Sequence, residues 1–123
     1  MGFGTLDEMA EFYAERAKGE VGLIVTGGIS PNNAGRGYFG AAKMSTSGES
    51  LKHKLVTDAV HSAGGRIAMQ ILHTGRYGYH FWAVSASNIQ APINKFKPHA
   101  LSSSEVNGTI DDFVRCAGNT KVH

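Results

Sequence analysis

Two short apolar segments, residues 21–25 and 67–72, constrain the fold of this chain more than any other feature. Each is as long as a strand and lacks polar alternation, so we expect two strands that are covered on both faces. An amphipathic segment precedes each one, at residues 6–17 and about 49–63, and a third helix is predicted after Ser102. The order helix, strand, helix, strand, helix is typical of βα units around a parallel sheet.

The predicted helix starts carry their own signals. Thr5 with Glu8, and Ser102 with Glu105, have the spacing of capping boxes, and Gly19 is placed to end the first helix. Two strands are too few for a stable parallel sheet. We therefore expect the chain either to associate with something else or to be a piece of a longer fold.

The loops that follow the strands are long, whereas the returns from helix to strand are short. About 20 residues separate the first strand from the second helix, and about 29 separate the second strand from the third helix, against the ~2–6 residues that are usual in α/β units. Ligands of barrels and doubly wound sheets bind at the carboxyl ends of the strands. This asymmetry predicts a ligand-binding α/β protein.

Glycine is abundant, with 16 residues in 123, and six positions match the dinucleotide-binding pattern GxGxxG at residues 35–40. That pattern acts by joining a strand directly to a helix N-terminus that holds the pyrophosphate. Here the glycines begin about nine residues beyond the strand, whereas the motif requires them to follow the strand directly. No helix start follows them. We do not interpret them as a nucleotide site.

Two features at the strand ends have open alternatives. Residues 26–28, Thr-Gly-Gly, either form a simple tight turn or leave bare backbone against which a flat ligand lies. Gln70, inside an apolar strand, needs hydrogen-bond partners. Its amide either pairs with a neighbouring strand or binds a heterocycle edge that carries both a donor and an acceptor.

The second long loop opens with a histidine and an arginine at the strand end. His73 is a candidate acid or base and Arg76 a candidate anion clamp, but a structural role in fixing the loop is an equal alternative. Aromatic residues that follow either line a pocket mouth or pack the loop: Tyr77, Tyr79, Phe81 and Trp82. No histidine or cysteine spacing predicts a metal site.

Composition argues against several classes of function. The net charge of +2, with dispersed basic residues, does not support nucleic-acid binding. One cysteine, Cys116, forms neither an internal disulfide nor a thiolate metal site. Neither a signal peptide nor an apolar segment of the ~20 residues that span a bilayer is present. We therefore expect a cytoplasmic protein that does not bind a membrane.

Five collinear segments resemble the flavin-dependent Old Yellow Enzyme family, in particular its NADH:flavin oxidoreductase and bacterial 2,4-dienoyl-CoA reductase branch. The similarity runs from about residue 6 to residue 116. The matching segments are residues 11–19 (EFYAERAKG), 21–28 (VGLIVTGG), 56–61 (VTDAVH), 70–77 (QILHTGRY) and 90–94 (QAPIN).

The resemblance implies an FMN-binding (β/α)₈ barrel, of which this chain forms a part: strands 2 and 3 with their flanking helices. It also implies that Gly28 lies against the flavin and that Gln70 hydrogen-bonds the pyrimidine side of the ring. His73 and Arg76 belong to the family's HxGR segment, which we interpret as supporting the pocket. No catalytic residue is assigned within the chain.

Other parts of the family pattern are expected outside this sequence. The first strand should precede Met1, and the catalytic tyrosine or histidine pair and the phosphate loops should lie beyond residue 123. The iron–sulfur cluster of the dienoyl-CoA reductase branch is not supported, because the chain has one cysteine. We expect residues 1–117 to be a partial FMN-binding barrel segment and residues 118–123 a non-homologous tail, as in a gene fragment.

The family activity is hydride transfer from NAD(P)H through FMN to an activated C=C bond, in a small molecule of the enoate or 2,4-dienoyl-CoA type. We expect this chain to be inactive alone and to bind FMN weakly. The alternative is a non-enzymatic partial barrel that self-associates, or the product of a decayed gene. The substrate and the choice between NADH and NADPH are not predictable from the sequence.

Overall fold

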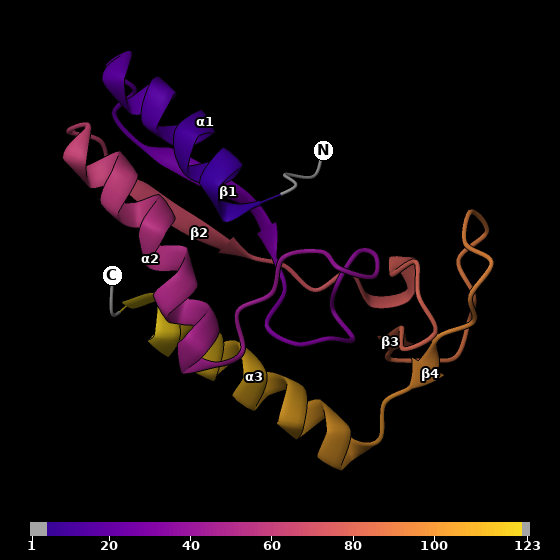
Figure 1. The fold of residues 1–123 in the computed structure, drawn as a ribbon. Coiled ribbons are helices and arrows are strands. Elements are labelled where there is room, and N and C mark those ends of the chain that lie inside the picture. The colour runs from indigo at the N-terminus through magenta and orange to yellow at the C-terminus, as the bar shows by residue number, and fades with distance from the viewer. Residues whose placement is uncertain (1–4, 122–123) are drawn as a thin grey trace.

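The computed structural model describes residues 5–121, which form an open α/β arrangement (Figure 1). Its elements, in chain order, are α1 (Leu6–Lys18), β1 (Ile24–Ile29), α2 (Ser47–Ser62), β2 (Ile67–Ile71), the 3₁₀ turn η1 (Gly75–Tyr77), β3 (Val84–Ser85), β4 (His99–Ala100) and α3 (Ser103–Lys121). Strands β1 and β2 are parallel neighbours, as the sequence predicts. The predicted order of helices and principal strands is therefore confirmed.

One face of the β1–β2 sheet is packed against helices α1 and α2, which lie side by side (Figure 1). We call this the covered face. Its strand residues are Ile24 and Ile29 of β1 and Ile67, Met69 and Ile71 of β2. The main core joins Ile24 and Ile67 to the buried faces of α1 and α2, at Met9, Ala10, Tyr13, Ala17, Val56 and Val60. Ile29, Met69 and Ile71 pack in a second cluster with Met44 and Cys116. This burial of apolar surface is the main stabilising term of the described fold.

The opposite face of the same sheet has no layer over it within residues 5–121. We call it the bare face, and it carries Val25, Gly28, Ala68, Gln70 and Leu72, all of them exposed. The expectation that both strands are covered on both faces is therefore wrong for the described chain. A second covering layer needs chain or ligand beyond the helices present, because α1 and α2 both lie on the other side.

The first strand also begins later than predicted. Residues 21–23 are apolar, but Glu20 has a left-handed φ of 71°, and pairing starts only where the Ile24 amide donates to the Arg66 carbonyl at 2.9 Å. The strand then continues through Gly28 to Ile29. Backbone hydrogen-bond partners on β2 and on Arg66 just before it, rather than side-chain apolarity, decide where β1 begins and ends.

Helix caps follow the predicted signals and include one that the sequence analysis omitted. The amide of Glu8 donates to Thr5 Oγ1 at 3.1 Å, and Ser102 and Glu105 bond reciprocally. Helix α2 starts two residues earlier than predicted because Thr46 caps it in the same way. Among the described residues, no helix combines the length and the apolarity that crossing a bilayer requires.

The C-terminal turns of helix α3 contact α2 and β2, whereas its N-terminal half lies away from both other helices (Figure 1). Its apolar residues Val106, Ile110 and Val114 are exposed. Cys116 is fully buried, packed with Ile29 and Met44, whereas Val114 is largely exposed. The helix continues to Lys121. The domain boundary after residue 117 stays a prediction.

Candidate functional site

A bulge in β1 sets the two predicted ligand-binding residues opposite each other. Val25 pairs with Ala68, and Gly28 pairs with Gln70, so β1 uses one residue more than β2 over this interval. The Thr26 hydroxyl accepts a hydrogen bond from the backbone amide of Gln70 at 3.1 Å and donates one to the Gly27 carbonyl at 2.8 Å. Thr26 therefore bridges the irregular ladder, and bulges of this kind are common beside functional sites.

Gln70 presents its side-chain amide on the bare face, where it is exposed and makes no hydrogen bond to any described residue. An amide has both a donor and an acceptor. The sequence left two alternatives for this side chain, pairing with a neighbouring strand or binding a ligand. Within the described residues it does not pair with a neighbouring strand. The group is available to a ligand.

Gly28 has a close neighbour on its own chain. A methyl group built on Gly28 would lie 2.3 Å from Leu72 Cδ2, far inside any normal contact. Position 28 must therefore be glycine, or Leu72 must move. The Leu72 side chain, from Cβ to Cδ2, therefore fills part of the space beside Gly28.

A cavity of about 190 Å³ opens at the carboxyl end of β1. Gly27 and Gly28 line one side, Leu72 and Thr74 come from the end of β2, and the first long loop supplies further lining. A methyl group on Gly27 would meet nothing within 4 Å. The long loops and strand ends thus enclose space where the sequence predicts a ligand. We call it the inner cavity.

The glycines of residues 35–40 serve a contact between the two long loops. A methyl group on Gly35 would lie 2.7 Å from both His73 Cδ2 and Ser30 Oγ. The Thr74 amide and hydroxyl both donate to the Gly35 carbonyl, at 3.0 and 3.1 Å, and the Tyr79 amide donates to the Gly37 carbonyl at 2.7 Å. These glycines therefore let one loop lie against the other.

His73 is held in a structural position. Its Nδ1 accepts the Gly75 amide hydrogen at 3.0 Å, and its ring stacks on Phe113 at 6.4 Å between centroids. Burial lowers the pKa of His73, Asp112 opposes this, and His80 lowers it further. Its Nε2 is buried without a partner among the described residues. The neutral ring with its proton on Nε2 fits these contacts.

Arg76 lies at the surface of the same loop rather than in an anion site. Its guanidinium centre lies 5.3 Å from the centroid of the Tyr77 ring, and its Nη2 lies 3.4 Å from the Tyr77 hydroxyl. Asn94, within the matching segment 90–94, is buried and donates to the carbonyls of Arg76 and Gly78. The 70–77 and 90–94 segments are thus joined by hydrogen bonds.

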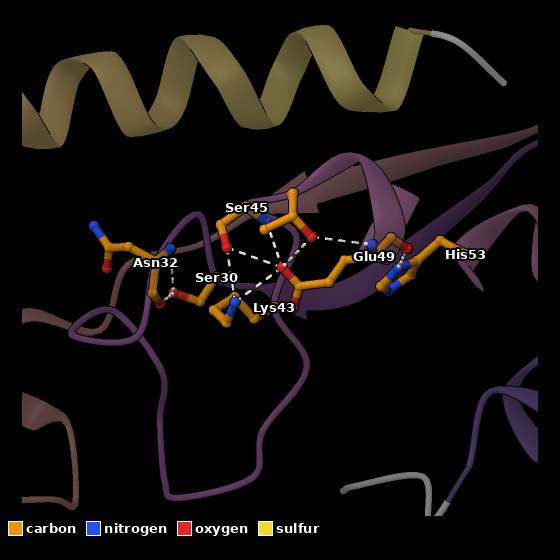
Figure 2. Close-up of polar contacts among 7 residues, drawn as sticks. Ser30, Asn32, Lys43, Ser45, Glu49 and His53 are labelled. Carbon is orange, nitrogen blue, oxygen red and sulfur yellow. Dashed lines mark hydrogen bonds and ion pairs between the residues drawn. The ribbon is translucent and has the colours of Figure 1, made fainter. Parts of the chain in front are cut away.

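A polar cluster fixes the return of the first long loop into α2 (Figure 2). One carboxylate oxygen of Glu49 accepts from Lys43 Nζ at 2.9 Å, Ser45 Oγ at 2.9 Å and the Ser45 amide at 3.1 Å. Burial raises the pKa of Glu49, but hydrogen bonds from Lys43 and Ser45 outweigh this and lower it to about 2. The end of the first long loop is therefore fixed to the first turn of α2.

Sequence analysis missed the residues that shape the site without resembling a motif. Thr26 carries no spacing signal, because its partner Gln70 is far along the chain. Lys43 carries none either, because it reaches Glu49 from an irregular loop. The Thr46–Glu49 capping box is a signal that could have placed Glu49 in advance. His80, which joins the two loops, has no such signal.

Known proteins with similar sequences share nearly all of this chain. The NADH:flavin oxidoreductase / NADH oxidase family matches residues 2–121. N,N-dimethylglycine/sarcosine dehydrogenase from Chromohalobacter salexigens is 31% identical over 124 residues, which cover 95% of this chain and 18% of that protein. Chanoclavine-I aldehyde reductase from Penicillium roqueforti is 30% identical over 90% of this chain and 32% of its own. The chain spans about a fifth to a third of these relatives.

Solved structures agree. Morphinone reductase superposes with a TM-score of 0.82 at 26% identity, over 92% of this chain and 35% of that one. 2-Naphthoyl-CoA reductase, in complex with 2-naphthoyl-CoA, gives 0.85 at 25% identity, over 98% and 21%. The predicted fold class, a partial (β/α)₈ barrel, is confirmed, and the described residues close no barrel. Old Yellow Enzyme homologues are among these neighbours, and the chain belongs to the NADH:flavin oxidoreductase / NADH oxidase family.

Proposed function

We propose that this chain supplies the flavin-ring contacts of an FMN-dependent NAD(P)H oxidoreductase whose substrate is a small molecule with an activated C=C bond. The observation that carries the proposal is the pairing of Gly28 with Gln70 on the bare face, beside the inner cavity. FMN with a nicotinamide hydride donor, predicted from the sequence, is the redox system of the family. The oxidoreductase activity of the complete enzyme is proposed here as well, since this chain spans only part of its relatives.

The residues present fit a flavin ring. The side-chain amide of Gln70 is unpaired among the described residues, and it offers both donor and acceptor groups. The edge of the ring's pyrimidine portion requires both. Gly28 has no side chain to hold a flat ring away from the backbone. When bound, FMN supplies the hydride-transfer chemistry, and the protein supplies position and electrostatics.

Thr26, His73 and the contact at Gly35 position this site. The Thr26 hydroxyl sets the register of Gln70. The His73 ring is turned into the loop, with Nδ1 used by the Gly75 amide, so we give it no acid or base role. The two long loops, joined at Gly35, shape the space above the strand ends.

The proposed enoate or 2,4-dienoyl-CoA type of substrate rests on the family. Among the similar proteins, several are reductases, including 12-oxophytodienoate reductase 7 from Oryza sativa subsp. japonica, which is 27% identical. The metal reductase from Desulforamulus reducens, at 29% identity, is named for a different kind of substrate. The experiment that tests the proposal therefore addresses the flavin ring and not the substrate.

The proposal is tested by titrating the chain with lumiflavin, which has the ring but no phosphate, and with FMN, while following flavin fluorescence. Because Gly28 and Gln70 address the ring, we expect both flavins to bind with similar, weak affinity. Gln70→Leu should weaken both at least about fivefold, the loss of roughly one hydrogen bond.

The matched control is Gln90→Leu, which makes the same chemical change at a residue whose amide donates within the second loop. It should leave flavin binding unchanged. Equal binding by Gln70→Leu and the unaltered chain, or no lumiflavin binding at 1 mM, roughly the weak end of specific affinity, would contradict the proposal.

A further inference from the structure

A second cavity of about 390 Å³ lies farther out between the two long loops. Its volume falls within the ~300–1,000 Å³ that is usual for small-molecule sites. It shares Arg36 and Tyr38 with the inner cavity, so the two adjoin. We call it the outer cavity. Its lining comes from both loops: Asn33, Ala34, Arg36, Tyr38, Phe39, His80 and Trp82.

The walls of the outer cavity are aromatic. Phe39 and Trp82 lie 6.0 Å apart between ring centroids, tilted by 35°, and His80 lies 5.9 Å from Trp82 with a tilt of 38°. Phe39 is 75% exposed and Trp82 is 56% exposed, so these rings are not packing a core. Exposed aromatic rings that flank one cavity are suited to stacking on a planar ligand.

These walls are held in place by His80. The Trp82 amide donates to His80 Nδ1 at 3.1 Å, so the ring proton lies on Nε2, which donates to the Arg36 carbonyl at 2.8 Å. One neutral imidazole thus joins the two loops across the cavity. A preformed site of this kind loses less conformational entropy when a ligand binds.

Arg36 gives the outer cavity a charge preference. Its guanidinium makes no ion pair with any described residue, and its Nε is buried without a hydrogen-bond partner. None of the lining residues is acidic. A buried donor on an unpaired cation costs free energy until an acceptor reaches it, and an anionic oxygen is the best such acceptor.

We propose that the outer cavity binds a planar aromatic ligand with an anionic group, its ring packed against the exposed faces of Phe39 and Trp82 and its anionic group at Arg36. That this ligand is the substrate rests on the proposed function, because the outer cavity adjoins the inner cavity, which Gly28 lines. Binding of an aromatic anion does not rest on it. The proposal therefore deepens the substrate class from any activated alkene to an aromatic acid derivative.

The test is calorimetric titration of the full chain with 2-naphthoate in the absence of flavin. Two comparison ligands separate ring from charge: 2-naphthalenemethanol keeps the ring without the anion, and cyclohexanecarboxylate keeps the anion without the ring. We expect 2-naphthoate to bind at least about tenfold more tightly than either, since it alone makes both contacts.

Variants identify the site. Arg36→Gln should weaken 2-naphthoate binding at least fivefold and leave 2-naphthalenemethanol unchanged, while Arg66→Gln, an exposed arginine outside the cavity, should change neither. Phe39→Leu should weaken both naphthyl ligands, and Phe81→Leu, which is even more exposed, neither. Circular dichroism verifies that each variant is folded.

The outcomes separate this inference from the proposed function. Binding of 2-naphthoate and lumiflavin at the same time supports two adjoining sites, whereas full competition would place naphthoate in the inner cavity and overturn the inference. Equal affinity for the alcohol, or no effect of Arg36→Gln, also overturns it. If lumiflavin binds and naphthoate does not, the proposed function stands and this inference fails. If naphthoate binds and lumiflavin does not, this inference stands and the proposed function fails.

Discussion

The two faces of the β1–β2 sheet differ in how far their interactions are completed within the chain. Ile24 and Val25 are consecutive residues, yet Ile24 is 7% exposed on the covered face and Val25 is 58% exposed on the bare face. Both are β-branched and apolar, so the local sequence does not distinguish them. The difference shows that helices α1 and α2 satisfy one face of the sheet, while the other face depends on something that the described residues do not contain.

The bare face is also where the polar and glycine residues of the site gather. Gln70 and Gly28 pair there, directly above Val25 and Ala68. In a barrel this face lines the interior. The packed helices on the covered face and the open site on the bare face therefore both follow from the arrangement of α1 and α2 on one side of the β1–β2 sheet.

The sharpest test of the comparison is a matched pair of truncations. Ile24→Ala should lower the free energy of unfolding by about 2–5 kcal/mol, because it leaves a cavity beneath both helices. Val25→Ala should lower it by less than about 1 kcal/mol, since little burial is lost. Urea unfolding followed by circular dichroism measures both. Similar losses at the two positions would mean that the bare face is covered in solution, as self-association would cause.

The predictability of the fold follows the same division. Helices α1 and α3 were predictable from their capping boxes, because a cap needs only residues three apart. The strand limits were not, because β1 begins where Arg66 supplies an acceptor, more than forty residues away. Glu20, not Gly19, holds the left-handed turn before the strand, and no local pattern signals this.

The site was predictable only in part. Gly28 and Gln70 were named from strand-end position and family resemblance, and the structure brings them together through a bulge at Thr26 that no pattern shows. The match to GxGxxG at residues 35–40 lies in a loop, and no helix follows it before Ser47. Its role at Gly35 depends on a contact with His73, which a one-dimensional pattern does not contain.

The polar anchor of the first loop should give the next largest effect, and one that depends on pH. The pKa of Glu49 is about 2 in the folded chain, so its ionised form stabilises the fold above the unfolded pKa of about 4.3, and this is lost as pH falls toward 2. We expect Glu49→Gln to cost up to about 3 kcal/mol at pH 7 and much less at pH 2.

Thermal unfolding at pH 7, 4 and 2.5 measures this dependence. Glu105→Gln is the matched control, because Glu105 also caps a helix and hydrogen bonds from Ser102 lower its pKa, but its side chain is 45% exposed. Since solvent screens an exposed carboxylate, this variant should change the pH dependence less than Glu49→Gln does. An acid-induced loss of equal size in Glu49→Gln and the unaltered chain would show that other carboxylates dominate.

The contact between the two long loops at Gly35, which we call the seam, should respond to an added methyl group more than the bulge of β1 does. Gly35→Ala places a carbon 2.7 Å from His73 and Ser30, which should cost about 1–3 kcal/mol. Gly27→Ala meets nothing within 4 Å and should change stability by less than about 1 kcal/mol. Chemical denaturation compares the two. Equal effects would mean that the seam opens freely in solution.

The smallest expected effect decides between two interpretations of Gly28. Leu72 is 42% exposed on the bare face, and its Cδ2 would meet a methyl group on Gly28. If the glycine is there for a flavin ring, Leu72 competes for part of that space, and Leu72→Ala should tighten lumiflavin binding about two- to threefold, or ~0.5 kcal/mol. If the glycine is there only for Leu72, the truncation removes packing and leaves lumiflavin binding unchanged. Because Leu72 is partly exposed, stability should fall by less than about 1–2 kcal/mol, and the binding measurement remains interpretable in a folded chain.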